Sequence, residues 1–176
     1  MLKRSSLIIL FASSILLAEC KVDYSVMYSI ANCEKHGKRE VGYPYLISFN
    51  SKKEAKKAKQ NLKLNWLDSR SVDCLSLNKC KENLKSLEKL GIKNLDLGAY
   101  QINKYWFDYK DYDEYFVLVK SYENACTKVY QNYKDTKVWS WETIARYHSK
   151  TPKFNKKYAS CLQKKYSSLN LQGDNK

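Results

Sequence analysis

Glu34 is the residue of this chain best suited to proton transfer. Three apolar residues precede it at the spacing of one helix face: Met27, Ile30 and Ala31. The pattern predicts a helix over residues 24–36 with a carboxyl group on its apolar side. Burial raises the pKa of a carboxyl group and keeps it protonated near neutral pH, as a general acid must be. The other interpretation is that Glu34 lies at a frayed helix end and points to water.

A second cluster is the stretch NLDLGAYQINKYWF, residues 94–107. Gly98 allows either a positive φ angle or close contact between bare backbone and a ligand. Tyr100, Gln101 and Asn103 follow with one ring and two amides. The stretch is therefore either a buried turn that enters an amphipathic segment or one wall of a binding site.

A third group lies in WETIARYHSKTPKFNKKYA, residues 141–159, and Asn124 lies in the predicted helix before it. Tyr147 lies in the middle of this group. His148 follows on an apolar helical stripe, where a histidine is more simply a satisfied core residue than a ligand. Tyr158 is likewise interpreted as a core residue.

In this order, the three groups resemble the lysozyme-like lytic transglycosylases of the soluble-transglycosylase family, especially small exported members that accompany secretion and conjugation machinery. The resemblance covers residues 23–166. Its strongest part is DLGAYQIN, residues 96–103, which is similar to the family's G-L-M-Q-I-N signature. IARYHS, residues 144–149, stands where the family has A-x-Y-N-x-G, and Asn124 resembles the asparagine of the family's N-I pair.

The resemblance implies an α+β, predominantly helical, lysozyme-like fold with a small β element beside a cleft. It also implies cleavage of the β-1,4 bond between N-acetylmuramic acid and N-acetylglucosamine in peptidoglycan. In this family a single Glu acts first as acid and then as base, while the C6 hydroxyl of the muramic acid closes on C1. The product is a 1,6-anhydro sugar and no water is consumed. Glu34 would take this catalytic role.

The resemblance also implies the substrate contacts. Gly98 would let the backbone approach the sugar, Tyr100 and Gln101 would line the subsites, and Tyr147 would hydrogen-bond near Glu34. The remaining expected substrate-binding residues are Asn103 and Asn124. No cofactor and no metal is expected. The expected partners are glycan strands of peptidoglycan and components of a secretion, conjugation or flagellar apparatus.

The chain departs from the family at several positions. Lys35 follows Glu34 where the family has serine, which leaves Glu40 as a competitor for the acid. Asp96 is a possible second carboxylate, but beside Gly98 it is explained more simply as a turn-former. Two alternative functions remain open: a hydrolytic muramidase that admits water, and a non-catalytic peptidoglycan-binding scaffold.

The N-terminus has the features of an export signal. Lys3 and Arg4 precede the apolar run LIILFASSILLA, residues 7–18, which is too short to span a bilayer. We expect cleavage near Ala18, a periplasmic location and no transmembrane segment in the mature chain. Removing the two charges at 3 and 4 lowers the formal net charge from +14 to +12. This basic surface suits the anionic wall or an acidic membrane surface, and export disfavours a nucleic-acid partner.

Six cysteines fit an exported protein with three disulfides. A lipoprotein acylated at Cys20 is disfavoured, because Glu19 is large and charged and because acylation would leave an odd number of thiols. Fifteen connectivities are possible. Cys126 with Cys161 and Cys74 with Cys80 are the pairs that we favour. A zinc site is disfavoured by the lack of a CxxC pair and by the presence of only two histidines.

The predicted order is one domain over residues 19–166, after a signal peptide over 1–18 and before a disordered tail over 167–176. We expect a short strand in 42–50, a helix capped by Ser51, a helix from Cys80 that ends at Gly91, a helix capped by Ser121 and a helix capped by Ser140. A last helix follows the break at 149–152.

Overall fold

The computed structural model describes residues 20–173, so the predicted signal peptide over 1–18 lies outside the described residues. The helices are α1 (Tyr24–Glu34), α2 (Lys52–Asn61), α3 (Leu77–Lys89), α4 (Asp113–Phe116), α5 (Leu118–Thr136), α6 (Trp141–Ala145) and α7 (Pro152–Gly173). The strands are β1 (Leu46–Phe49), β2 (Ser71–Asp73), β3 (Leu95–Leu97) and β4 (Ile102–Asn103). The chain is α+β and mainly helical, as expected.

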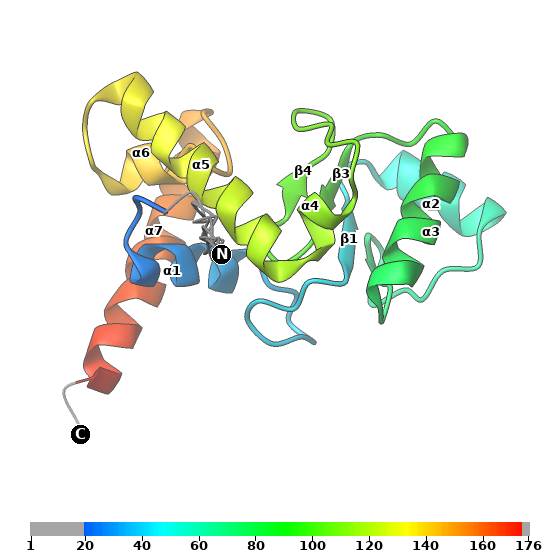
Figure 1. Ribbon diagram of the computed structural model, residues 1–176, viewed down its shortest axis with the longest axis horizontal. Coiled ribbons are helices and arrows are strands. Elements are labelled where there is room, and N and C mark those ends of the chain that lie inside the picture. Colours follow the sequence, from blue (N-terminus) through cyan, green and yellow to red (C-terminus); the bar gives the residue numbers. More distant parts are fainter. Residues whose placement is uncertain (1–19, 174–176) are drawn as a thin grey trace, which may run out of the picture.

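The chain forms two halves, one of helices alone and one that combines helices with the strands. Figure 1 shows α1, α5, α6 and α7 gathered in one half, and α2 and α3 with the strands in the other. The strands form one antiparallel sheet in the order β2-β1-β3-β4. The small β element that was expected is therefore present, and it lies between the two groups of helices.

Two disulfides hold the helical half together. Cys33 on α1 pairs with Cys161 on α7, and Cys20 pairs with Cys126 on α5. The prediction that Cys126 pairs with Cys161 is wrong, because α7 packs along α1 and brings Cys161 to the end of that helix. Cys33 precedes Glu34 directly, so this disulfide fixes the end of α1 to α7.

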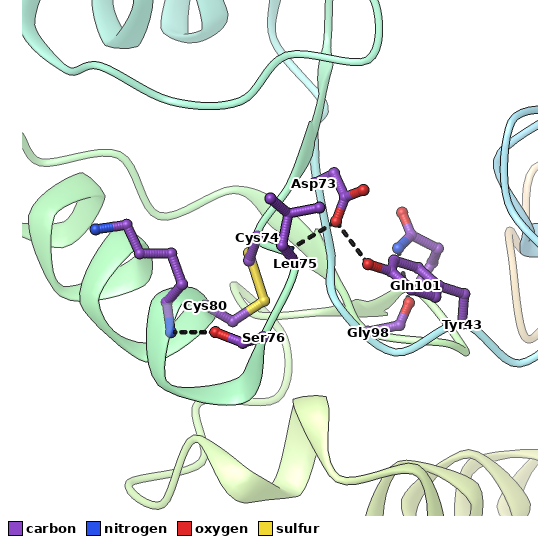
Figure 2. Close-up of a disulfide and its surroundings, with 9 residues drawn as sticks. Tyr43, Asp73, Cys74, Leu75, Ser76, Cys80, Gly98 and Gln101 are labelled. Carbon is purple, nitrogen blue, oxygen red and sulfur yellow. Dashed lines mark hydrogen bonds between the residues drawn. A yellow bond between two sulfur atoms is a disulfide. The ribbon is translucent and has the colours of Figure 1, made fainter.

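The third disulfide, Cys74 with Cys80, was predicted correctly and stabilises the edge of the sheet. Figure 2 shows it beside Asp73, a buried carboxylate at the end of β2. Oδ1 of Asp73 accepts hydrogen bonds from the Tyr43 hydroxyl and the Leu75 backbone N–H, both at 2.8 Å. Arg39 donates to the other oxygen of this carboxylate. The buried charge is therefore paired, as its burial requires.

The local signals placed several helix ends correctly. Ser51 accepts a hydrogen bond from the backbone N–H of Glu54, and Ser140 accepts one from that of Thr143. Gly91 follows α3 with φ +74°, which is the left-handed conformation expected after a helix. The cap predicted at Ser121 is wrong. Helix α5 already begins at Leu118, because the preceding Val117 is extended.

Two further expectations differ from the structure. The stretch 94–107 contains the hairpin β3–β4 and not only a turn, with Asp96 opposite Asn103. The tail expected after Tyr166 is instead a continuation of α7 as far as Gly173, and residues 174–176 lie outside the described part.

Candidate active site

Glu34 lies in a cleft of about 770 Å³ between the helical half and the sheet. It is the last residue of α1, and its side chain is only 12% exposed. The residues before it, Met27, Ile30 and Ala31, are buried. The position of Glu34 therefore agrees with a shielded carboxyl group at the apolar face of α1. It does not agree with the alternative, a side chain at a frayed helix end that points to water.

Two aromatic side chains pack beside Glu34. His148 Nδ1 lies 3.5 Å from Glu34 Oε1, and hydrogen bonding to this carboxylate, together with its negative charge, raises the pKa of His148. The ring of Tyr158 stacks on His148 with 4.7 Å between centroids. Burial and the nearby Glu34 carboxylate raise the pKa of Tyr158, whose hydroxyl has no hydrogen-bond partner among residues 20–173. His148 is half-exposed in the cleft, so its expected position in the core is wrong.

The opposite wall of the cleft is the β3–β4 hairpin. Asp96 lies between two buried leucines of β3, and because side chains alternate along a strand, its carboxylate faces away from them. Asn103 Nδ2 donates to Asp96 Oδ1 at 2.7 Å across the strand pair. Burial raises the pKa of Asp96, and the Glu34 carboxylate adds to this effect. Glu34 and Asp96 thus line the same cleft from two different walls.

The turn of the hairpin places Gln101 in the cleft, and Gly98 makes this turn possible. Gln101 has a positive φ of 46°, and its side-chain amide donates to the carbonyl of Gly98 at 2.8 Å. Gly98 has φ +75°, and a Cβ at this position would lie 1.9 Å from the carbonyl oxygen of Tyr115. The glycine therefore allows contact with the backbone of α4, whereas contact with a sugar was expected.

Two of the expected tyrosines contact each other behind the cleft. Tyr100 is 5% exposed and is not among the residues that line the cleft. The hydroxyl of Tyr147 donates to the backbone carbonyl of Tyr100 at 2.6 Å, while its ring lines the cleft. Tyr147 thus joins the helical half to the hairpin. The structure places neither hydroxyl group in the cleft as a hydrogen-bonding partner of Glu34.

The cleft continues into a second cavity of about 690 Å³ over α5. Lys128 and Tyr147 line both cavities. Asn124 lines only the second, where its amide donates to a carboxylate oxygen of Glu114 at 2.8 Å. The structure therefore brings Glu34, Gln101, Asn103 and Tyr147 together at the first cavity and leaves Asn124 apart from them.

Exposed aromatic rings stand at the edge of the cleft. The side chain of Trp106 is 75% exposed and lines both cavities, and Phe154 is 53% exposed and lines the first. Exposed rings of this size beside polar groups suit a ligand with flat apolar faces, such as a sugar ring.

Sequence reasoning missed Lys128 and Trp106 and undervalued Asp96. A signal for Lys128 existed, because it lies four residues after Asn124 and so on the same face of one helix. For Asp96 the signal was the alternation Leu95-Asp96-Leu97, which is typical of a half-buried strand.

No family model, curated protein or solved structure matches this chain. Within residues 20–173, no helix is long and apolar enough to cross a membrane. In the same part of the chain, no group of three or more His, Cys, Asp or Glu residues is placed to hold a metal ion. The functional assignment therefore depends on the geometry of the cleft and on the sequence resemblance.

Proposed function

We propose that this protein is an exported peptidoglycan lytic transglycosylase with a lysozyme-like fold. The observation that carries the proposal is the position of Glu34, a shielded carboxyl group that faces Gln101 and Asn103 across one cleft. A cleft with a shielded carboxyl group at the end of a helix, amide side chains and exposed aromatic rings suits the cleavage of a sugar polymer.

In the proposed reaction, Glu34 protonates the glycosidic oxygen as the bond to C1 of the muramic acid breaks. The resulting carboxylate then takes the proton of the C6 hydroxyl as that oxygen bonds to C1. Gln101 and Asn103 would position the sugar from the hairpin side. The buried ring of Tyr158, stacked on His148, helps to shield this carboxyl group from water.

Hydrolysis is the second candidate, and Asp96 is the observation that favours it. Glycosidases that use water or a covalent intermediate need two carboxyl groups at the scissile bond. Asp96 lines the same cleft as Glu34 and is fixed by Asn103. In a transglycosylase the substrate's own hydroxyl is the nucleophile, so Asp96 would serve only to stabilise positive charge at C1.

Mass spectrometry of muropeptides released from purified sacculi distinguishes these reactions. The wild-type protein should release 1,6-anhydro products, whereas a muramidase releases products with a reducing end. Glu34→Gln should abolish release in either case, with a loss of at least about 100-fold, because a general acid contributes about that much. Glu40→Gln is the matched control and should retain activity, since Glu40 does not line the cleft.

Asp96→Asn separates the two mechanisms further. A transglycosylase should retain measurable release of anhydro products in this variant, whereas a two-carboxylate hydrolase should lose its activity as completely as in Glu34→Gln. Full activity of Glu34→Gln would refute both. Binding of sacculi by the wild type without any released sugar would support the scaffold alternative instead.

The proposed setting is local opening of the wall during assembly of an envelope-spanning machine, such as a secretion, conjugation or flagellar apparatus. Three disulfides are compatible with an oxidising location outside the cytoplasm. Cys20 is bonded to Cys126, so in this form its sulfur is not available for acylation.

A further inference from the structure

The two cavities of the cleft differ in charge, and the proposed reaction does not use this difference. Around Glu34, carboxylates and basic groups are equal in number: Glu34, Asp68 and Asp96 with Arg70, Lys128 and His148. The second cavity has an excess of basic groups: Lys128, Arg146, His148 and Lys150 with the single carboxylate of Asp135. An anionic group would therefore be favoured in the second cavity over the first.

Lys128 stands in the wall that the two cavities share. Its ammonium group lies 4.3 Å from the ring centre of Tyr147 and 5.0 Å from that of Phe107. Within residues 20–173, no carboxylate oxygen lies within 4.0 Å of it, although other lysines of this chain form such pairs. Burial lowers the pKa of Lys128, while the more distant Glu34 and Asp96 act in the opposite direction.

Lys128 is partly buried, which is unfavourable for its charge. An ammonium group that is withdrawn from water without an ion-pair partner is destabilising, and two aromatic faces compensate only in part. Because the cavity opens beside it, a ligand can supply the missing negative charge. A carboxylate is the natural choice, since charge-assisted hydrogen bonds between ammonium and carboxylate are among the strongest in proteins.

We propose that the second cavity is an anion subsite, in which Lys128 binds a carboxylate carried by the lactyl arm of N-acetylmuramic acid. The inference rests on the proposed function, because it takes a muramic-acid polymer as the substrate. The arm ends in a free carboxylate where the peptide stem has been removed, and it bears the carboxylates of the stem where it has not. Only the second cavity has an excess of basic groups, so the arm is directed toward Arg146 and Lys150.

Binding measurements in the inactive Glu34→Gln protein test this subsite directly. Four ligands are compared by calorimetry: peptide-free glycan strands, the same strands with their lactyl carboxylates converted to amides, strands that keep their peptide stems, and neutral N-acetylglucosamine oligomers. Lys128→Met removes the charge and keeps a side chain of similar length. Lys134→Met is the matched control, because Lys134 lies on the same helix, also covers an aromatic ring, and lines neither cavity.

Lys128→Met should weaken the binding of carboxylate-bearing strands about tenfold and leave the amidated strands and neutral oligomers unchanged. Lys134→Met should change none of the four. A loss confined to peptide-free strands identifies the free lactyl carboxylate, and would place this protein after an amidase reaction. A loss confined to stem-bearing strands identifies the peptide carboxylates.

Equal weakening of all four ligands, or no weakening of any, would overturn the proposal. Thermal unfolding of Lys128→Met shows whether this variant folds. Lys128→Arg keeps the positive charge, so it should bind the carboxylate-bearing strands more tightly than Lys128→Met does. Failure of the subsite is distinguishable from failure of the proposed function, because release of anhydro-muropeptides is measured separately with Lys128 in place.

Discussion

Gly98→Ala should destabilise the protein through one contact with the backbone. Gly98 has φ +75°, which costs about 1–2 kcal/mol for a residue with a Cβ. The added Cβ would also lie 1.9 Å from the carbonyl oxygen of Tyr115, an atom that cannot rotate away. Overpacking of this kind costs about 1–3 kcal/mol more.

Gly91→Ala is the matched control for this substitution. Gly91 has nearly the same φ, +74°, but a Cβ there would meet nothing within 4 Å. Both variants therefore carry the backbone strain, and only Gly98→Ala carries the clash. Since 1 kcal/mol shifts the Tm of a domain of this size by about 2–4 °C, Gly98→Ala should melt roughly 2–12 °C below Gly91→Ala.

Thermal unfolding followed by circular dichroism under non-reducing conditions measures the difference. The hairpin carries Gln101 and Asn103, so Gly98→Ala should also reduce muropeptide release, whereas Gly91→Ala should not. Equal melting temperatures would refute the role that we assign to the Tyr115 contact. Equal stability with lost activity in Gly98→Ala would instead support close approach of the sugar to this glycine.

Two further predictions concern the surroundings of Glu34. Glu34→Gln should lower the pKa of His148, measured by an NMR titration of its ring protons, because the charge that raises this pKa is removed. Since the folded-state pKa of His148 is raised, the pair stabilises the wild type at acidic pH, and this contribution is lost as pH rises through that pKa. Replacing Cys33 and Cys161 together by serine should cost about 2–5 kcal/mol of stability, measured by urea unfolding, and should reduce activity because Glu34 follows Cys33 directly.

Each of these predictions has an internal comparison. His36, the other histidine of the chain, lies beside Asp68 and serves as the reference signal for the titration. An unchanged His148 titration in Glu34→Gln would contradict the contact. Replacing Cys74 and Cys80 by serine removes a cross-link of sequence separation 6 rather than 128, so it should cost less stability. If the variant without the Cys74–Cys80 disulfide lost more activity than the variant without the Cys33–Cys161 disulfide, the role of the Cys33 disulfide would be contradicted.

Local signals carried the predictions that succeeded. The caps at Ser51 and Ser140 and the glycine after α3 depend on hydrogen bonds within a few residues, so neighbouring residues suffice to specify them. Glu34 was placed by the same means, because a helical stripe of four residues already orients its side chain.

The predictions that failed depend on long-range packing. Strand β3 has three residues and β4 has two, so local alternation is too brief to identify the hairpin, which pairing of β3 with β1 and of β4 with β3 fixes. Disulfide partners separated by 106 and 128 residues depend on which helices pack together, which spacing along the chain does not reveal.

The sequence alone determined that the chain is mainly helical and that Glu34 ends an apolar stripe. It also determined that residues 96–103 carry polar side chains, those of Gln101 and Asn103, close to Gly98. Only the tertiary structure decided that Asp96 faces the same cleft as Glu34, that Gly98 contacts Tyr115, and that Lys128 stands between two cavities with no ion-pair partner among residues 20–173. The physical reason is that helix faces and caps depend on contacts within one or two turns. The cleft of this protein depends instead on long-range packing, because its walls come from α1, the β3–β4 hairpin and the segment around Tyr147, which are far apart in the sequence.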